Sequence, residues 1–416
     1  MNILHLSDLH FNSESYEKFT QHDMINKLLS FLTSLNKKID LVIFSGDLVY
    51  NGSNSDDFID AKNIFLTKLC EELKISENEI ILCAGNHDMD RTSKSDSLEE
   101  KFESKIKNSD SLFDFFKTKD YDYNTAIKTT ENYNTFIKDY YKDIENVKIN
   151  DLYTIYKKKI DGNEIGILSI NSSWRSVDDS SNGKLLFPKF LLEDALYEIK
   201  NVKCKFIVLH HPIHWFKDFN QSELQNLIFK SCNIMFSGHI HESEITTHYK
   251  QNNGIFAHVS PASLTWEKDF IGFSIIEYDV KNESNALVSK YHFIKENDNF
   301  NFIEEVSVRI PCGEEKNEQN RVREKINSKI NLELLNAKDL LLTNNFDEEN
   351  DNAFLDLFNN PKINSRPKQD ISENLNAESD KFEFETLLKN ENNYFIYGQD
   401  KAGKSSILKY IQLYHL

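Results

Sequence analysis

The chain has 416 residues, with 49 basic and 67 acidic side chains and a formal net charge of −18. Its length predicts two or three domains, and 39% hydrophobic and 12% aromatic residues exclude a wholly disordered protein. The acidic balance excludes a polycation that coats nucleic acid by bulk attraction. A phosphate-bearing substrate would therefore need local partners, such as bound metal ions.

The first 90 residues alternate between two kinds of apolar pattern. Apolar runs at residues 2–6, 41–44 and 80–83 predict strands, and the apolar residues within 24–35 and 58–73 recur at helical spacing. This alternation predicts an α/β fold with parallel strands and crossover helices. Each predicted strand ends in a polar cluster, which is where open α/β sheets place their ligands.

Residues 91–147 are charged and aromatic and predict helices inserted after the third strand, in a cap that occupies about residues 91–150. The cap either packs as a support or shapes a substrate site, and we favour a substrate role because it follows directly on a chemical motif. Strands are then predicted at 153–159, 164–170, 206–209 and 233–236, with a helix at 190–199. The runs at 255–259, 270–278, 287–293 and 302–308 predict antiparallel strands.

The pattern changes after residue 310, where Pro311-Cys312-Gly313 begins a Glu-, Lys- and Asn-rich stretch. We predict a first domain over 1–310, a helical and polar linker over 311–380 with a helix at 321–342, and a separate segment over 381–416. The five cysteines have no close pairs and predict reduced thiols, and no apolar run approaches the ~20 residues of a membrane span. We expect a cytoplasmic protein without a membrane segment.

Five short motifs each follow a predicted strand: Asp8-Leu9-His10, Gly46-Asp47, Gly85-Asn86-His87-Asp88, His210-His211-Pro212 and Gly238-His239-Ile240-His241. Mixed imidazole and carboxylate ligands suit Zn, Mn or Fe, whereas an all-oxygen site would suit Mg or Ca. Two donors at positions i and i+2 of a strand end face the same side of the pleat. Seven candidate ligands are enough for two metal ions if one carboxylate bridges them.

In this order, the five motifs resemble those of the calcineurin-like metallophosphoesterases, over about residues 1–310. The resemblance implies a four-layer αββα sandwich with two metal ions at the carboxyl ends of the strands. It places Asp8, His10, Asp47 and His241 on one ion, and Asp47, Asn86, His210 and His239 on the other, with Asp47 as the bridge. It also implies a metal-bridging hydroxide as nucleophile and His87 as proton donor to the leaving oxygen.

The chemistry of these residues agrees with that expectation. Two ions about 3.5–4 Å apart lower the pKa of a shared water and stabilise the phosphate oxygens during in-line attack. His87 has an ordinary pKa of ~6.5, which suits proton donation near neutrality. Asp88 either orients His87 or contacts the metal shell through water. His211 competes with His210 as a ligand or touches substrate.

Other residues have open or ordinary roles. Trp174 and Trp215 follow predicted strands and either line the pocket or anchor the cap. The histidines at positions 5, 22, 248, 258 and 292 are expected to be structural or surface residues.

A phosphate-binding pattern, G-x-x-x-x-G-K-S, lies near the C-terminus at Gly398, Gly403, Lys404 and Ser405. A strand-like run at 394–397 precedes it and a helical run at 406–414 follows, as a P-loop requires. Lys404 would reach the outer phosphates of ATP, and the Ser405 hydroxyl would bind Mg²⁺. Few residues follow, so we expect the N-terminal fragment of a P-loop NTPase domain, resembling the STAND and NACHT class, in a longer protein that self-assembles under ATPase control.

We expect a metal-dependent hydrolase that cleaves phosphodiester bonds of a nucleotide or nucleic acid and uses Mn, Fe or Zn. One alternative is a DNA exo- or endonuclease resembling the double-strand-break repair phosphoesterases. The alternative from another class is a non-catalytic scaffold or nucleotide-sensing module, which would require lost ligands.

Overall fold

The computed structural model describes most of the first 311 residues and short parts of the remainder. The described ranges are 1–13, 17–93, 96–119, 121–160, 162–176, 181–202, 204–250, 253–264, 271–280, 285–311, 363–364, 381–382, 384 and 407. The chain divides into two compact units, Met1–Glu318 and Gln319–Leu416. In the second unit, β14 (Ile363–Asn364) pairs with β15 (Lys381–Phe382). The predicted helix at 321–342 and the P-loop residues Gly398, Gly403, Lys404 and Ser405 lie outside the described residues.

The first sheet of unit 1 has six strands in the order β13-β12-β11-β1-β2-β3. Their bounds are β1 (Asn2–Leu6), β2 (Leu41–Phe44), β3 (Ile80–Leu82), β11 (Gly272–Tyr278), β12 (Asn285–Ile294) and β13 (Asn299–Arg309). Strands β1, β2 and β3 are parallel, as the alternating pattern predicts. Strand β11 pairs antiparallel with β1 and β12, and β13 continues the antiparallel half.

The second sheet has seven strands in the order β4-β5-β6-β7-β8-β10-β9. Their bounds are β4 (Val147–Ile149), β5 (Tyr153–Ile160), β6 (Asn163–Ile170), β7 (Cys204–Val208), β8 (Ile234–Ser237), β9 (Glu244–Lys250) and β10 (Asn253–Val259). The antiparallel pairing predicted for residues 255–259 is present between β10 and β9. Strand β10 also runs parallel to β8, which the sequence did not predict. The chain crosses from β8 to the edge strand β9 and returns as β10, so β10 regains the direction of β8.

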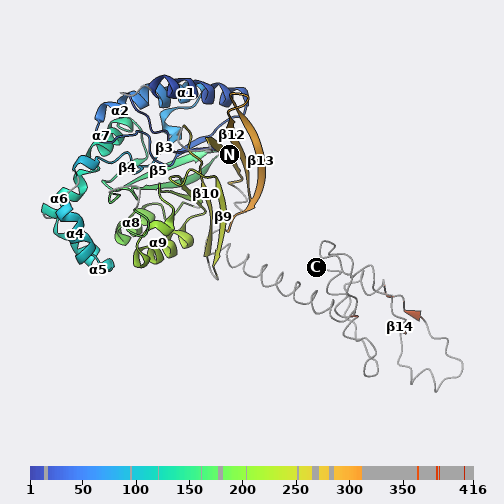
Figure 1. Ribbon diagram of the computed structural model, residues 1–416. Coiled ribbons are helices and arrows are strands. Elements are labelled where there is room, and N and C mark those ends of the chain that lie inside the picture. The colour runs from blue at the N-terminus through green and yellow to red at the C-terminus, as the bar shows by residue number, and fades with distance from the viewer. Residues whose placement is uncertain are drawn as a thin grey trace, which may run out of the picture. The chain divides into compact units, whose positions relative to one another are not determined.

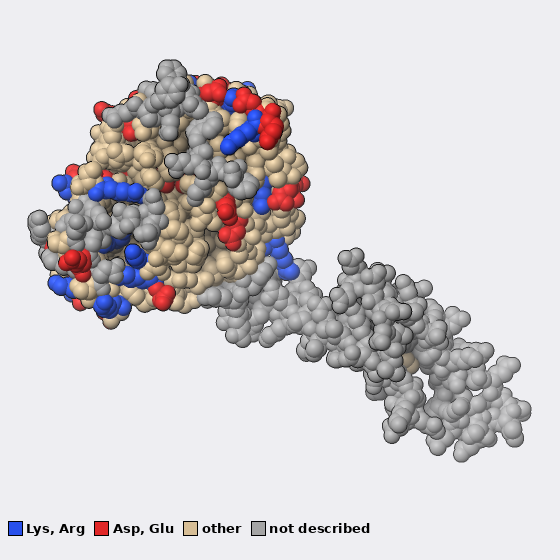
Figure 2. Space-filling model, in the orientation of Figure 1, with Lys and Arg blue, Asp and Glu red and all other residues tan. Residues whose placement is uncertain are grey.

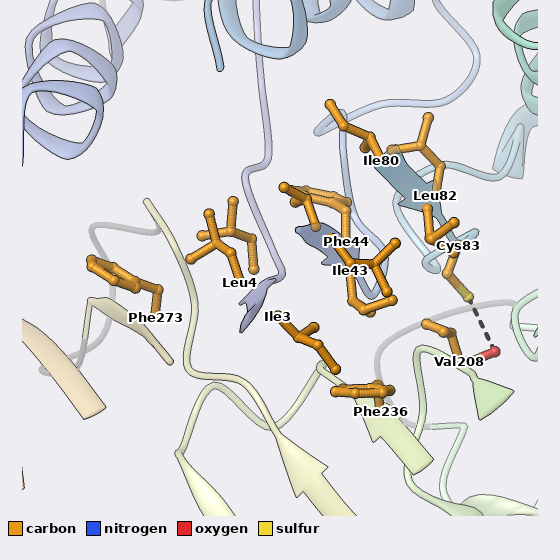
Figure 3. Close-up of a cluster of buried hydrophobic side chains, with 14 of the residues drawn as sticks. Ile3, Leu4, Ile43, Phe44, Ile80, Leu82, Cys83, Val208, Phe236 and Phe273 are labelled. Atoms are coloured by element: carbon orange, nitrogen blue, oxygen red, sulfur yellow. Dashed lines mark hydrogen bonds between the residues drawn. The ribbon is translucent and has the colours of Figure 1, made fainter. Parts of the chain in front are cut away.

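Helices cover the outer faces of the two sheets, with α1 and α2 on one side and α8 and α9 on the other (Figure 1). The bounds are α1 (Glu17–Ser34), α2 (Ser55–Ala61), a π-helical turn (Lys62–Leu66), α3 (Thr67–Leu73), α8 (Lys189–Glu198) and α9 (Asp218–Ser231). Between the sheets, Ile3 of β1 and Phe236 of β8 belong to one buried cluster (Figure 3). Cys83 joins this layer, with its Sγ 3.7 Å from the carbonyl oxygen of Val208.

The predicted inserted helices are present as α4 (Asp96–Lys105), α5 (Ser109–Thr118), α6 (Tyr121–Lys128) and α7 (Glu131–Tyr140). Phe102 and Phe116 pack around Trp174, whose side chain is 1% exposed and whose indole donates to the Leu186 carbonyl at 2.6 Å. Trp174 is therefore an apolar anchor beneath the inserted helices. Helix α7 instead packs against α2.

Acidic and basic side chains are intermixed on the described surface of unit 1 that faces the viewer in Figure 2. The four described cysteines, Cys70, Cys83, Cys204 and Cys232, are buried free thiols. Within the described part of the chain, no helix combines the length and apolarity that crossing a membrane requires.

Candidate metal centre

The seven predicted ligands converge at one edge of the two sheets, where five strands end. Asp8 and His10 follow β1, Asp47 follows β2, Asn86 follows β3, His210 follows β7, and His239 and His241 follow β8. Parallel strands within each sheet direct their carboxyl ends to the same edge. Groups from the two sheets therefore meet there, although they are more than 200 positions apart in sequence.

Asp8, His10 and His241 form the first group of the centre. His241 Nε2 lies 3.1 Å from Asp8 Oδ1, and His10 Nε2 lies 3.7 Å from the same oxygen. Asp47 Oδ2 is 3.6 Å from His10 Nε2, which brings this carboxylate to the edge of the group. Two imidazoles and two carboxylates thus surround a small space.

Asn86, His210 and His239 form the second group. Asn86 Oδ1 lies 2.9 Å from His210 Nε2 and 3.0 Å from His239 Nδ1. Asp47 Oδ2 is also 3.2 Å from His210 Nε2, so one carboxylate oxygen reaches both groups. This is the arrangement that a bridging carboxylate needs.

The donor chemistry fits divalent cations. Asp8 and Asp47 are 0% and 1% exposed, and buried carboxylates need compensating positive charge. His10 Nε2 is buried without a hydrogen-bond partner among the described residues, although it faces both carboxylates. His210 Nδ1 donates to the Ser45 carbonyl at 2.9 Å, which in the neutral ring leaves a lone pair on Nε2 directed at the cluster. The His and Asp clusters therefore imply two divalent metal ions.

The pKa values of these groups show the same preference for positive charge. Burial disfavours the imidazolium of His210, but the carboxylates of Asp47 and Asp8 outweigh it and raise the pKa to about 9. Burial would also keep Asp8 protonated, yet His10, His210 and His241 hold its pKa well below the usual range. His239 is different, because burial and then the charge of His210 lower its pKa to about 4.

The backbone at the ligands differs from the strand pleat that we expected to pair the donors. Strands β1 and β8 end at Leu6 and Ser237, before the ligand pairs begin. Five ligands instead have left-handed backbone conformations: Asp8 (φ 56°), His10 (φ 50°), Asp47 (φ 57°), His239 (φ 69°) and His241 (φ 59°). Non-glycine residues seldom adopt this region, and such strain clusters at functional sites.

Hydrogen bonds between neighbouring loops hold these conformations. The backbone nitrogens of Asp8 and His10 donate to the carbonyls of Gly46 and Asp47, at 2.9 and 3.0 Å. Gly46 has φ 115°, and a Cβ there would lie 2.5 Å from His210 Nδ1. The glycine of the Gly46-Asp47 motif is thus required by both its conformation and its contact with a ligand.

His87 borders the first group. Its backbone nitrogen donates to Asp47 Oδ1 at 2.7 Å, and its ring centroid lies 4.5 Å from that of His10. Its Nδ1 donates to the carbonyl oxygen of Tyr50 at 2.9 Å, so the other ring nitrogen, Nε2, is the one that exchanges protons. Burial is the largest influence on the ring and lowers the pKa of His87, despite the opposing charge of Asp47.

Asp88 has a role that the sequence left open. Its Oδ2 accepts hydrogen bonds from the backbone nitrogens of Asp47 and Gly85, and its Oδ1 accepts one from Val49. Burial and then the charge of Asp47 raise its pKa to about 7. Asp88 therefore secures the loop that carries Asp47.

His211 lies behind the second group. Its ring centroid is 4.4 Å from that of His239, and its Nδ1 is 3.1 Å from the Ser172 hydroxyl. It is fully buried, and burial followed by the charges of His210 and His239 lowers its pKa well below the usual range. Its ligand-capable atoms lie within 4.8 Å of those of His210 and His239, so it remains a competitor for the second group by distance.

The sequence analysis did not identify Tyr50 as a residue of the centre, and it left the role of Trp215 open. Tyr50 belongs to no motif, and its position three residues after Asp47 was the only available signal. Trp215 borders His239, with ring centroids 4.4 Å apart, whereas Trp174 is the buried anchor described above.

The family model described as calcineurin-like phosphoesterase matches residues 1–243, which include all seven predicted ligands. The chain belongs to the calcineurin-like phosphoesterase family. It is accordingly a metallophosphoesterase, a hydrolase of phosphoric esters, built as an α/β sandwich of two mixed sheets. No curated protein matches this calcineurin-like phosphoesterase in sequence.

Solved structures resemble this phosphoesterase at low identity. A dimetal phosphatase from Danio rerio is 12% identical, with 74% of this chain and 98% of that chain covered and a TM-score of 0.43. A purple acid phosphatase from yellow lupin (Lupinus luteus) is 13% identical, with 74% and 53% covered and a TM-score of 0.44. An archaeal phosphodiesterase is 13% identical, with 74% and 100% covered and a TM-score of 0.27.

Proposed function

We propose that this phosphoesterase cleaves phosphodiester bonds of a nucleotide or nucleic acid, with His87 as general acid. The position of His87 carries the proposal, because it borders the cluster and its Nδ1 is fixed by the Tyr50 carbonyl. An alkoxide leaving group of a phosphodiester needs a proton as its bond to phosphorus breaks, and the Nε2 of a protonated His87 would supply it.

The ligands have separate roles in this proposal. Asp8, His10, Asp47 and His241 hold one ion, and Asp47, Asn86, His210 and His239 hold the other. When bound, the two ions lower the pKa of a water and neutralise charge on the phosphoryl oxygens. The Asp47 carboxylate contacts both ligand groups and also accepts a hydrogen bond from the backbone N–H of His87. It therefore links the position of the proposed general acid to the metal centre. The mixed nitrogen and oxygen donors favour Mn, Fe or Zn.

A substrate panel tests the proposal. Metal-stripped protein is reconstituted separately with Mn²⁺, Fe²⁺ and Zn²⁺ and assayed on bis(p-nitrophenyl) phosphate, p-nitrophenyl phosphate, cyclic mononucleotides, DNA and RNA. We expect hydrolysis of diesters and slower hydrolysis of the monoester. Exclusive hydrolysis of monoesters would contradict the proposal.

The panel also separates the competing functions. Degradation of DNA ends would favour the nuclease, whereas hydrolysis of cyclic nucleotides with intact DNA would favour a nucleotide phosphodiesterase. The scaffold hypothesis required lost ligands, and all seven predicted ligands converge here. An absence of turnover with every metal, in a protein that still binds two ions, would restore it.

We also infer that the C-terminal pattern binds ATP with Mg²⁺, with Lys404 at the outer phosphates. The spacing of Gly398, Gly403, Lys404 and Ser405 supports this inference. Equilibrium binding of a fluorescent ATP analogue should be lost in Lys404→Ala and kept in the neighbouring control Lys409→Ala. Equal binding by both variants would contradict it.

A further inference from the structure

Two aromatic side chains flank the metal centre, one beside each group of ligands. The Tyr50 ring lies 5.4 Å from that of His87, with an interplanar angle of 32°, and 6.3 Å from that of His10. Trp215 lies 4.4 Å from the ring of His239 and 5.6 Å from that of His211. Tyr50 thus borders the first group, and Trp215 borders the second.

Tyr50 is exposed, but its backbone is held by hydrogen bonds. The residue is 53% exposed, and its ring contacts those of His87 and His10. Its backbone nitrogen donates to the Phe11 carbonyl at 2.9 Å, and its carbonyl accepts from His87. The Gly52 nitrogen donates to the His87 carbonyl at 2.7 Å, and Asn132 of α7 donates to the Gly52 carbonyl at 2.9 Å. Because this segment is already ordered, a ligand that stacks on Tyr50 has little ordering cost.

The backbone of Trp215 is also held by hydrogen bonds. It ends the short helix Ile213–Trp215, where its nitrogen donates to the Pro212 carbonyl at 3.0 Å and its carbonyl accepts from Leu185 at 3.3 Å. The residue remains partly exposed, unlike the buried Trp174. Its ring stands at 86° to that of His239 and at 37° to that of His211.

We propose that Tyr50 and Trp215 are stacking platforms for two bases, one on each side of the scissile phosphate. The substrate would then be an internucleotide phosphodiester in a single strand, because a cyclic mononucleotide has only one base to stack. Aromatic platforms are the usual means of holding unpaired bases without reading their sequence. This inference rests on the phosphodiesterase function proposed above.

The proton donor assigns the two sides. His87 defines the leaving-group side of the phosphate, and Tyr50 lies against His87. Tyr50 therefore receives the base of the leaving nucleoside, and Trp215 receives the base of the nucleoside that keeps the phosphate. The two platforms consequently depend on different bases of one dinucleotide.

A binding experiment tests this assignment without turnover. The probes are the phosphorothioate of thymidylyl-(3′,5′)-thymidine and two analogues that each lack one base, and calorimetry measures their dissociation constants with Mn²⁺-loaded protein. Removal of either base should weaken binding about tenfold. Tyr50→Ala should remove the preference for the leaving-side base alone, and Trp215→Ala should remove the preference for the other base alone.

Two further variants complete the test. Tyr50→Phe keeps the ring and should keep the base preference, and Tyr197→Ala removes an exposed tyrosine of α8 that is 66% exposed and should behave as wild type. Equal binding of all three probes by the wild-type protein would overturn the inference. An unchanged base preference in both Tyr50→Ala and Trp215→Ala would overturn it as well.

Turnover of bis(p-nitrophenyl) phosphate separates this inference from the function on which it rests. Turnover without base-dependent binding overturns the platforms and leaves the phosphodiesterase proposal standing. Base-dependent binding that needs Tyr50 or Trp215, without turnover of any diester, overturns the phosphodiesterase proposal and supports the platforms. If neither base-dependent binding nor turnover of a diester is observed, both the platforms and the phosphodiesterase proposal are overturned.

Discussion

The carboxylate of Asp88 accepts a hydrogen bond from the backbone nitrogen of Asp47 at 3.0 Å. Asp88 is fully buried and accepts hydrogen bonds from three backbone N–H groups in the loops after β2 and β3. Asp47 is the carboxylate whose Oδ2 approaches both ligand groups. The geometry of the metal centre therefore depends on a side chain that is not among the predicted ligands.

Asp88→Asn should destabilise the protein and weaken metal binding. The amide would place donor hydrogens against backbone N–H groups, and a buried donor left without a partner costs about 1–3 kcal/mol. Urea unfolding of the metal-free protein measures the stability loss, and Asp56→Asn, at an exposed position of α2, is the control. An Asp88→Asn protein with wild-type stability and metal content would refute the loop-securing role.

Asp47→Asn should abolish turnover. The substitution removes one of the two negative charges that the carboxylates of Asp8 and Asp47 bring to the site. The loss of turnover should exceed the roughly 10–100-fold loss that is typical when a residue that hydrogen-bonds to a metal ligand is replaced. Hydrolysis of bis(p-nitrophenyl) phosphate and metal content by mass spectrometry are measured together. Asp23→Asn, at an exposed carboxylate of α1, is the matched control. Unchanged hydrolysis by Asp47→Asn would contradict the bridging role of Asp47.

His87→Asn should affect poor leaving groups far more than good ones. A general acid contributes about 10²–10⁴-fold when the leaving oxygen needs a proton, and p-nitrophenolate leaves without one. The rates are compared for methyl p-nitrophenyl phosphate and a thymidine dinucleotide, with His214→Asn, at an exposed position, as control. Equal losses on both substrates would indicate that His87 serves the structure or the metal ions instead.

His258 should make the metal-free protein acid-sensitive. It is fully buried, with its Nδ1 2.6 Å from that of His5, and burial followed by Lys290 lowers its pKa to about 3. Its folded pKa lies below the unfolded value of ~6.5, so the unfolded chain binds more protons between these values. Stability present above pH 6.5 is therefore lost as the pH falls, by about 2 kcal/mol at pH 5.

Urea unfolding at pH 7 and pH 5 in the presence of EDTA measures this loss. His258→Gln should lose less stability across the interval than the wild-type protein, whereas His22→Gln, at a partly exposed position of α1, should lose as much. Parallel losses in wild type and His258→Gln would show that the protonation of other groups causes the acid sensitivity.

The sequence predicted which residues meet at the metal site, but it did not predict the backbone conformations that bring them together. Apolar runs located β1 and β2 to the residue, and motif order identified the side chains that meet, because parallel strands bring their carboxyl ends together. The left-handed conformation of Asp8 and His239 was not foreseen. The Asp8 nitrogen donates to the Gly46 carbonyl and the His239 nitrogen donates to the Asp8 carboxylate, and both partners are distant in sequence.

Other features had too weak a local signal. Strand β9 reads Glu-Ile-Thr-Thr-His-Tyr-Lys, whose polar residues conceal an edge strand that is specified by its pairing with β10. The parallel β8–β10 pair was missed for the same reason. Tyr50 lies outside every motif, and only its contact with His87 draws attention to it.

The place of β1 in its sheet has a consequence for protein synthesis. Asn2 pairs with Glu277 across β1 and β11, so one side of β1 stays open during synthesis until the chain has grown past residue 277. At ordinary translation speed this takes tens of seconds. During that interval the nascent chain carries Asp8 and His10 directly after a strand with an unsatisfied edge. A fragment that stops at residue 243, where the family match ends, would keep that edge permanently and should aggregate on release.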